Sequence, residues 1–168
     1  YAVPSHSRLF KNLGASGKPG VFVDATKEAG VELESRVDLV YSFSSSFTDF
    51  DSDGNVDLMV ASDFNTTRFY WNNGDGTFTN GTVDAELGKE ENAMGLAVGF
   101  MGKPQKQVMM VTSIRAKADC DDASDLILTG NRLFEYSGKR VFSDITDKAG
   151  VRNGFWGWGT SFLDSTNA

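Results

Sequence analysis

The chain has 168 residues and a formal net charge of −7, so a nucleic acid partner is disfavoured because its phosphates would be repelled. Glycine is frequent, at 18 residues, proline occurs only 3 times, and aromatic residues make up 12% of the chain. This composition suits a globular, β-rich protein. No stretch approaches the roughly 20 apolar residues that a membrane-spanning helix needs, so no membrane span is expected.

The first predicted element is a hairpin in residues 8–31, RLFKNLGASGKPGVFVDATKEAGV. Alternating arginine and aromatic residues lead into a glycine-rich turn, and an apolar run follows, which is typical of two paired strands. Residues 24–37 also contain good helix formers, but Gly30 interrupts them. We therefore expect only a short helical or irregular turn after the hairpin.

Residues 47–62, FTDFDSDGNVDLMVAS, place carboxylates at alternating positions around one glycine and then become apolar. Aspartates at positions 1, 3 and 5 of a tight loop bring hard oxygen ligands to one point, as Ca²⁺ requires, and a glycine at position 6 permits the turn. The sequence predicts a calcium loop over residues 49–57, with ligands from Asp49, Asp51, Asp53, the backbone carbonyl of Asn55, and Asp57.

Other interpretations of this loop are less favourable. An EF-hand would carry Glu at position 12, where this chain has Val60, and the loop continues into a strand-like segment instead of a helix. Mg²⁺ prefers fewer carboxylates and more waters. An aspartate-rich turn without metal is the remaining alternative. Four carboxylates within nine residues would repel one another without a cation, which favours calcium.

A second hairpin is predicted in residues 68–88, and two glycosylation sequons lie near it, at Asn65 and Asn80. Chance sequons are common. Together with the single cysteine, Cys120, and a loop suited to extracellular calcium, they favour an extracellular or secretory-pathway location. A bacterial periplasm or cell surface would suit the loop equally well.

The calcium pattern is not repeated in the corresponding segment after the second hairpin. In GLAVGFMGKPQKQVMMVTS, which starts at Gly95, the first three ligand positions fall on Phe100, Gly102 and Pro104, so no site is expected there. The acidic segment 117–125 lacks the alternation and is better explained as a solvated insertion than as a second metal site.

A third hairpin is predicted in residues 132–151, and a glycine- and tryptophan-rich segment follows it. Trp71, Trp156 and Trp158 could stack on a sugar, but aromatic residues at such spacing more often fill the space between sheets. Near the end, Asp164 matches position 1 of a further loop. Thr166 and Ala168 occupy its positions 3 and 5, which leaves metal binding there open.

The three hairpins begin at Arg8, Arg68 and Arg132, 60 and 64 residues apart, and a strand-turn-strand element separates them. A repeat of about four strands is the unit of a β-propeller blade. The predicted fold is therefore all-β, a partial propeller of about two and a half four-stranded antiparallel blades with short helical turns. We expect residues 1–168 to be one segment of a larger propeller, whose open edges are covered by further blades of the same or a neighbouring chain.

DFDSDGNVDLMVAS resembles the calcium loop of FG-GAP/VCBS repeats, which form integrin-α-type propellers. The order of an LF-N-G hairpin, a glycine-rich strand and a calcium loop is similar to the cartilage acidic protein (ASPIC/UnbV-containing) group. AMGLAVGF and GFWGWGTSFLD also look like that group's strands. The resemblance implies a calcium-stabilised propeller.

Catalytic patterns are weak. His6 is the only histidine, and neither a phosphate loop nor a zinc-binding spacing is found. We expect a non-catalytic module with extracellular structural, adhesion, or protein- or glycan-binding roles. The alternatives are the scaffold part of a larger secreted enzyme and a subunit of an extracellular polymer.

Overall fold

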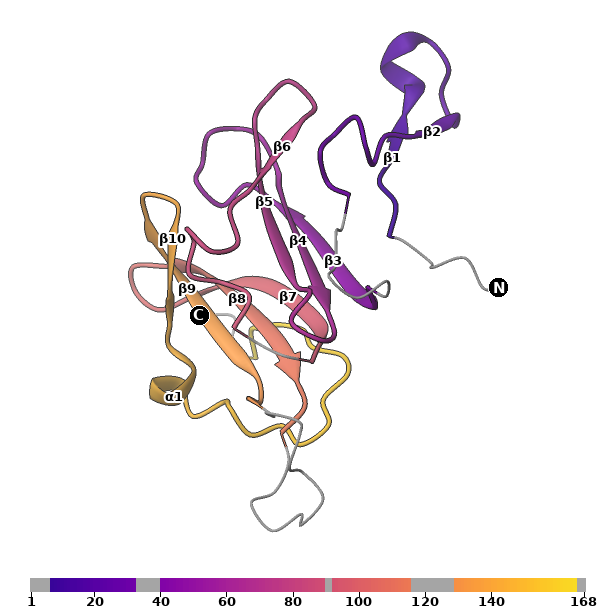
Figure 1. The fold of residues 1–168 in the computed structure, drawn as a ribbon. Helices are drawn as coiled ribbons and strands as arrows, with labels where there is room; N and C mark the ends of the chain where they lie inside the picture. The colour runs from indigo at the N-terminus through magenta and orange to yellow at the C-terminus, as the bar shows by residue number, and fades with distance from the viewer. Residues whose placement is uncertain (1–6, 33–39, 90–91, 116–128, 166–168) are drawn as a thin grey trace, which may run out of the picture.

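The computed structural model describes residues 7–32, 40–89, 92–115 and 129–165. Within these ranges the chain forms one two-stranded and two four-stranded sheets, and every strand pair is antiparallel (Figure 1). The prediction of an all-β chain with about two and a half blades is confirmed. His6, Cys120, the acidic segment 117–125, Thr166 and Ala168 lie outside the described residues.

The strands follow the chain without crossovers inside each sheet. The two-stranded sheet, the N-terminal hairpin, consists of β1 (Phe10–Asn12) and β2 (Phe22–Asp24), with the 3₁₀ turn η1 (Leu13–Ser16) between them. The first blade is β3 (Ser42–Thr48), β4 (Asp57–Ser62), β5 (Arg68–Asn72) and β6 (Phe78–Asn80). The second blade is β7 (Ala93–Met101), β8 (Lys106–Ser113), β9 (Arg132–Gly138) and β10 (Val141–Asp144), and α1 (Thr146–Ala149) follows it.

Strand β4 is buried along its whole length because it is covered on both faces. Successive strand residues point to opposite faces. Met59 and Ala61 belong to the core between the two blades, whereas Leu58 and Val60 pack with residues that follow the N-terminal hairpin. The apolar run LMVA therefore needs no alternation, since neither face meets water.

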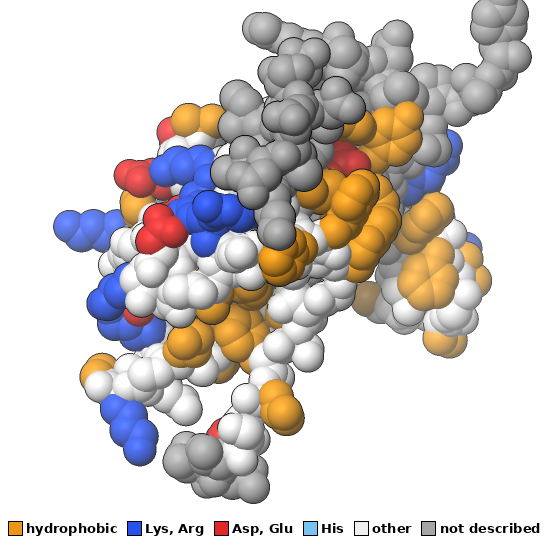
Figure 2. Space-filling model, turned by 90° about the horizontal axis from the view of Figure 1, so that it is seen from below, with side chains coloured by type: hydrophobic (Ala, Val, Ile, Leu, Met, Phe, Trp, Pro, Cys, Tyr) orange, Lys and Arg blue, Asp and Glu red, His pale blue; other side chains and the backbone are white. Residues whose placement is uncertain are grey.

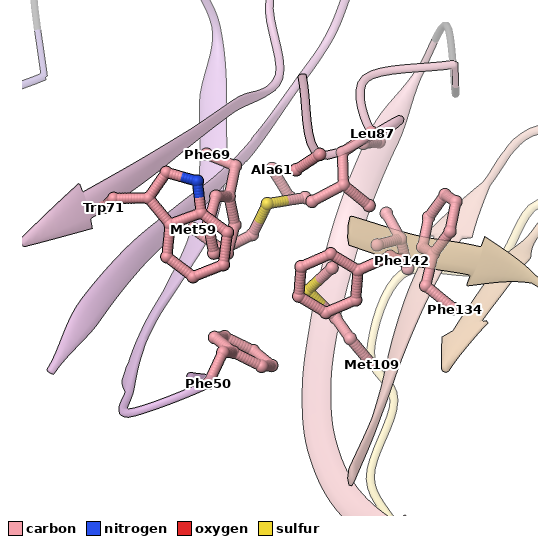
Figure 3. Packing of buried hydrophobic residues seen from close by; sticks show 12 residues of the cluster. Phe50, Met59, Ala61, Phe69, Trp71, Leu87, Met109, Phe134 and Phe142 are labelled. Atoms are coloured by element: carbon pink, nitrogen blue, oxygen red, sulfur yellow. The ribbon is translucent and has the colours of Figure 1, made fainter. Parts of the chain in front are cut away.

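The core between the blades is rich in aromatic side chains (Figure 3). Phe50 and Phe69 of the first blade meet Phe142 of the second, with ring centroids 5.2 and 5.5 Å apart in edge-to-face geometry. Each such ring contributes about 1.5–3 kcal/mol through burial. These contacts fix how the two sheets lie against each other, which matters for the site described below.

Each hairpin ends in the same hydrogen-bonded motif, an Asp or Asn followed two residues later by Thr. In each copy the threonine hydroxyl accepts a hydrogen bond of 2.8 Å from a backbone N–H at the start of the hairpin and donates to the Asp or Asn side chain. The three copies are Asp24 and Thr26, Asn80 and Thr82, and Asp144 and Thr146. The motif therefore ties the last strand of each hairpin back to its first.

A tight turn follows each motif, as expected. Gly30, Gly88 and Gly150 adopt the left-handed conformation, with φ of 72°, 73° and 71°. Only the third turn, α1, is helical, and the described part of residues 24–37 contains no helix. Within the described ranges no helix has the length and apolarity to cross a bilayer.

The segment after α1 packs against β7 and β8, the first two strands of the second blade. Thr112 Oγ1 donates to the carbonyl of Trp158 at 3.0 Å, and a Cβ added to Gly95 would lie 2.1 Å from that same oxygen. Only glycine allows so close an approach.

The three tryptophans lie in different surroundings. Trp71 is buried between the blades, but Trp156 and Trp158 are 63% and 57% exposed, so the prediction that these two pack in the core is wrong.

Candidate metal centre

The predicted calcium loop joins β3 to β4, and the pair Thr48 and Asp57 closes the ladder beneath it. Side-chain oxygens shape the turn. Asp49 accepts hydrogen bonds from the backbone N–H groups of Asp53 at 3.2 Å and Gly54 at 3.0 Å. Gly54 has a φ of 91°, which a residue with a side chain rarely adopts. The sequence folds into this turn because its aspartates replace the missing backbone partners.

Three carboxylates converge in this loop. One oxygen each of Asp49, Asp51 and Asp57 lie within 4.8 Å of one another. All three are hard anionic ligands, and their spacing suits a single cation held between them. The donor set therefore fits Ca²⁺, and these residues would hold it.

Asp57 anchors the cluster, because it is fully buried. Its two carboxylate oxygens accept backbone N–H groups of Phe50 at 3.1 Å and Asn72 at 3.0 Å. Burial raises the pKa of Asp57, the two hydrogen bonds oppose the rise, and the nearby charges of Asp51 and Asp53 add to it. A bound cation would relieve this cost of charging a buried acid.

The other two predicted ligands lie differently. Asp53 is exposed and does not belong to the converging group. One of its oxygens accepts the N–H of Asn55 at 2.8 Å, and the other faces an arginine. Ligation by Asp53 and by the carbonyl of Asn55 stays a prediction.

Sequence reasoning missed Arg140, which lies in the β9–β10 turn of the second blade and contacts the loop of the first. Its Nε donates to Asp51 Oδ2 at 2.7 Å, and a terminal nitrogen lies 3.5 Å from Asp53 Oδ2. The guanidinium lies 4.9 Å from the centre of the Trp71 ring. The partners Arg140 and Asp51 are 89 positions apart, and the sequence carries no signal for their pairing.

The equivalent turn of the second blade offers no such cluster. Phe100 is 63% exposed, and Val108 takes the buried place that Asp57 has in the first blade. Among the described residues, Asp49, Asp51 and Asp57 form the only group of three or more possible metal ligands.

The sequon residues occupy different settings. Asn65 is exposed in a turn, with a φ of 58°. Asn80 takes the motif position held by Asp24 and Asp144, and its Oδ1 accepts from Thr82. The structural motif thus accounts for the sequence Asn80-Gly-Thr82 without a glycan.

Comparison with known families agrees with this geometry. Residues 49–99 match the model of the FG-GAP-like repeat. The match begins at the first aspartate of the loop and runs through β4, β5 and β6 into β7. Among curated proteins, none matches the chain. The loop and the strands after it thus support a repeat of the FG-GAP, propeller-like kind.

Proposed function

We propose that this chain is part of a non-catalytic, calcium-stabilised β-propeller with extracellular structural, adhesion, or protein- or glycan-binding roles. The observation that carries the proposal is the convergence of Asp49, Asp51 and Asp57 in a turn that faces the neighbouring blade. We further propose that the propeller is of the cartilage acidic protein (ASPIC/UnbV-containing) type, because its hairpins and glycine-rich strands resemble that group.

In this proposal calcium neutralises the loop and holds it closed. The buried Asp57 positions the ion above the β4–β5 backbone, and Asp49 and Asp51 cover it from the turn. A ligand that binds only the folded state adds RT ln(1 + [Ca]/Kd), about 2.7 kcal/mol at a hundredfold excess over Kd. The ion would thereby stabilise the fold.

Exposed apolar surface supports a partner. Figure 2 shows groups of exposed hydrophobic side chains on the face seen from below. Separately, a groove of about 240 Å³ lies along β3, where Phe43 and Phe47 flank Leu58 and Val60. Phe43 and Phe47 are 45% and 49% exposed. Such a groove suits a protein, a glycan or a further blade better than a charged polymer.

An extracellular, secretory-pathway or bacterial surface location follows from the same proposal, since a loop of this kind suits calcium at millimolar concentration. Two other roles remain as alternatives. A larger secreted enzyme would carry a catalytic domain in the full-length sequence. A polymer subunit would form large particles in native mass measurements, through pairing of exposed strand edges.

Thermal unfolding of the full chain tests the calcium site. We expect the melting temperature to rise with millimolar Ca²⁺, to rise less with Mg²⁺, and to fall on chelation. The double variant Asp49→Asn with Asp51→Asn should lose the calcium response. Asp84→Asn, at an exposed aspartate outside the loop, is the matched control and should keep it. An unchanged melting temperature in the unmodified protein at all calcium concentrations would refute the proposal.

A further inference from the structure

Arg140 is held against the aspartate loop by contacts of two kinds. Its guanidinium pairs with Asp51 and Asp53, at 2.7 and 3.5 Å, and lies over the ring of Trp71. Its backbone N–H donates to the hydroxyl of Tyr136 at 3.2 Å. The positive charge therefore has a defined place beside the carboxylates instead of moving freely in solvent.

This contact crosses the boundary between the blades. Asp51 and Asp53 belong to the β3–β4 turn of the first blade, whereas Arg140 belongs to the β9–β10 turn of the second. The side chain of Asp51 is only 10% exposed, so its negative charge is poorly solvated. A fixed guanidinium offsets part of that cost, and it does so only while the blades are in contact.

A calcium ion bound by the same loop would lie close to this guanidinium. Both cations would interact with the same carboxylate, that of Asp51. Two positive charges a few ångströms apart repel each other even in a medium of high dielectric constant. Calcium must therefore bind against the field of Arg140. Without calcium, in contrast, Arg140 is the cation that partly neutralises the loop.

We propose that Arg140 is a built-in counter-ion of the aspartate loop, which lowers the affinity of the loop for calcium and joins the two blades when calcium is absent. This inference rests on the proposed calcium site. It makes the second blade a regulator of a site formed by residues of the first. Arg140, which does not itself bind the ion, would thus lower the calcium affinity of the loop to a value suited to calcium-rich surroundings.

Calorimetric titration with Ca²⁺ and thermal unfolding in a chelator test the inference on the full chain. In Arg140→Gln, the calcium Kd should fall roughly three- to tenfold, because the repelling charge is gone. In the chelator, the same variant should melt about 2–4 °C lower, because the loop has lost its counter-ion. Arg140→Lys keeps the charge and should stay closer to the unmodified protein in calcium affinity.

Lys139→Gln is the matched control, because it removes the same charge from the adjacent position of the same turn. Lys139 and Arg140 both have positive φ, of 56° and 62°, and Lys139 forms no salt bridge with any residue in the described ranges. Its calcium Kd should change by less than about twofold.

The possible outcomes separate this inference from the proposed function. Tighter calcium binding by Arg140→Gln, with lower stability in the chelator, supports the counter-ion role. Unchanged or weaker binding by that variant overturns it while leaving the calcium site intact. If the unmodified protein binds no calcium, the proposed function fails first and the inference fails with it.

Discussion

The β3–β4 loop and the β7–β8 turn occupy the same place in successive blades, yet they are built from different chemistry. The first closes over the buried carboxylate of Asp57, and the second over the buried side chain of Val108. Both join strands in an antiparallel four-stranded sheet. The comparison shows that a blade of this kind can close the turn at this position without a carboxylate cluster.

The two connections are also stabilised by different partners. In the first blade, carboxylates accept backbone N–H groups within the loop. In the second, Lys106 at the start of β8 pairs with Glu135 on β9 at 2.5 Å. An exposed ion pair of this kind contributes at most about 1 kcal/mol. The ion pair of the second blade thus joins two strands, whereas the β3–β4 loop is held by its own side chains, by Arg140 and, in our proposal, by calcium.

Placing the buried acid of the first blade into the second gives the largest expected effect. Val108→Asp should lower the free energy of unfolding by about 3–5 kcal/mol, because the turn above it has no carboxylates to share a cation and the new charge is buried. Urea unfolding measures the loss. Val108→Ala, which only removes volume, should cost less. Equal losses for the two variants would show that charge is not the difference between the sites.

Removing the acid from the first blade is expected to have the next largest effect. In a chelator, Asp57→Ala should cost about 2–4 kcal/mol, because the N–H groups of Phe50 and Asn72 lose their acceptor in a buried place. Asp57→Asn keeps one acceptor and carries no charge, so it should cost less. Calcium should stabilise neither variant. The assigned role would be contradicted if Asp57→Ala lost the same stability with and without the chelator and was still fully stabilised by calcium.

Close packing against the second blade gives a smaller effect. Gly95→Ala should cost about 1–3 kcal/mol, because its Cβ would collide with the carbonyl of Trp158. Gly159→Ala is the control, since no atom lies within 4 Å of a Cβ there and its φ lies outside the left-handed region. Differential scanning calorimetry compares them. If the two substitutions cost the same, the segment after α1 does not pack on β7 as described.

The smallest effect concerns the motif that ends the second blade. Burial alone would raise the pKa of Asp144, but hydrogen bonds from Thr146 and the charges of Arg132 and Arg152 outweigh it, so the pKa lies below 3.8. The resulting stability is fully present above pH 3.8 and is lost as the pH falls through the folded-state pKa.

Asp144→Asn should therefore cost about 1 kcal/mol at neutral pH and progressively less below pH 3.8. Urea unfolding between pH 3 and pH 7 measures this. The first blade carries Asn80 at the equivalent position, so the amide is compatible with the motif. A loss that does not change with pH would mean that the charge of Asp144 adds nothing.

Much of the fold could be predicted from local pattern. The hairpins, the turns after them and the buried strand after the loop depend on residues close in sequence, such as Gly54 and the run that begins at Leu58. Three of the predicted ligands, Asp49, Asp51 and Asp57, converge because strand pairing places both ends of the loop together.

The contacts between blades could not be predicted in this way. They depend on how one sheet is rotated against the next, which the repeat pattern does not specify. This is why Arg140 was missed. It is also why the sequence did not predict that Trp156 and Trp158, which resemble core residues, are exposed in the described structure.

A crystal structure of the full chain grown in millimolar Ca²⁺, with anomalous scattering used to locate the ion, tests the central claim most directly. We predict one ion beside β4, bound by carboxylate oxygens of Asp49, Asp51 and Asp57 at about 2.3–2.6 Å, and none in the β7–β8 turn. Continuous density for the loop with no ion between these carboxylates would contradict the claim.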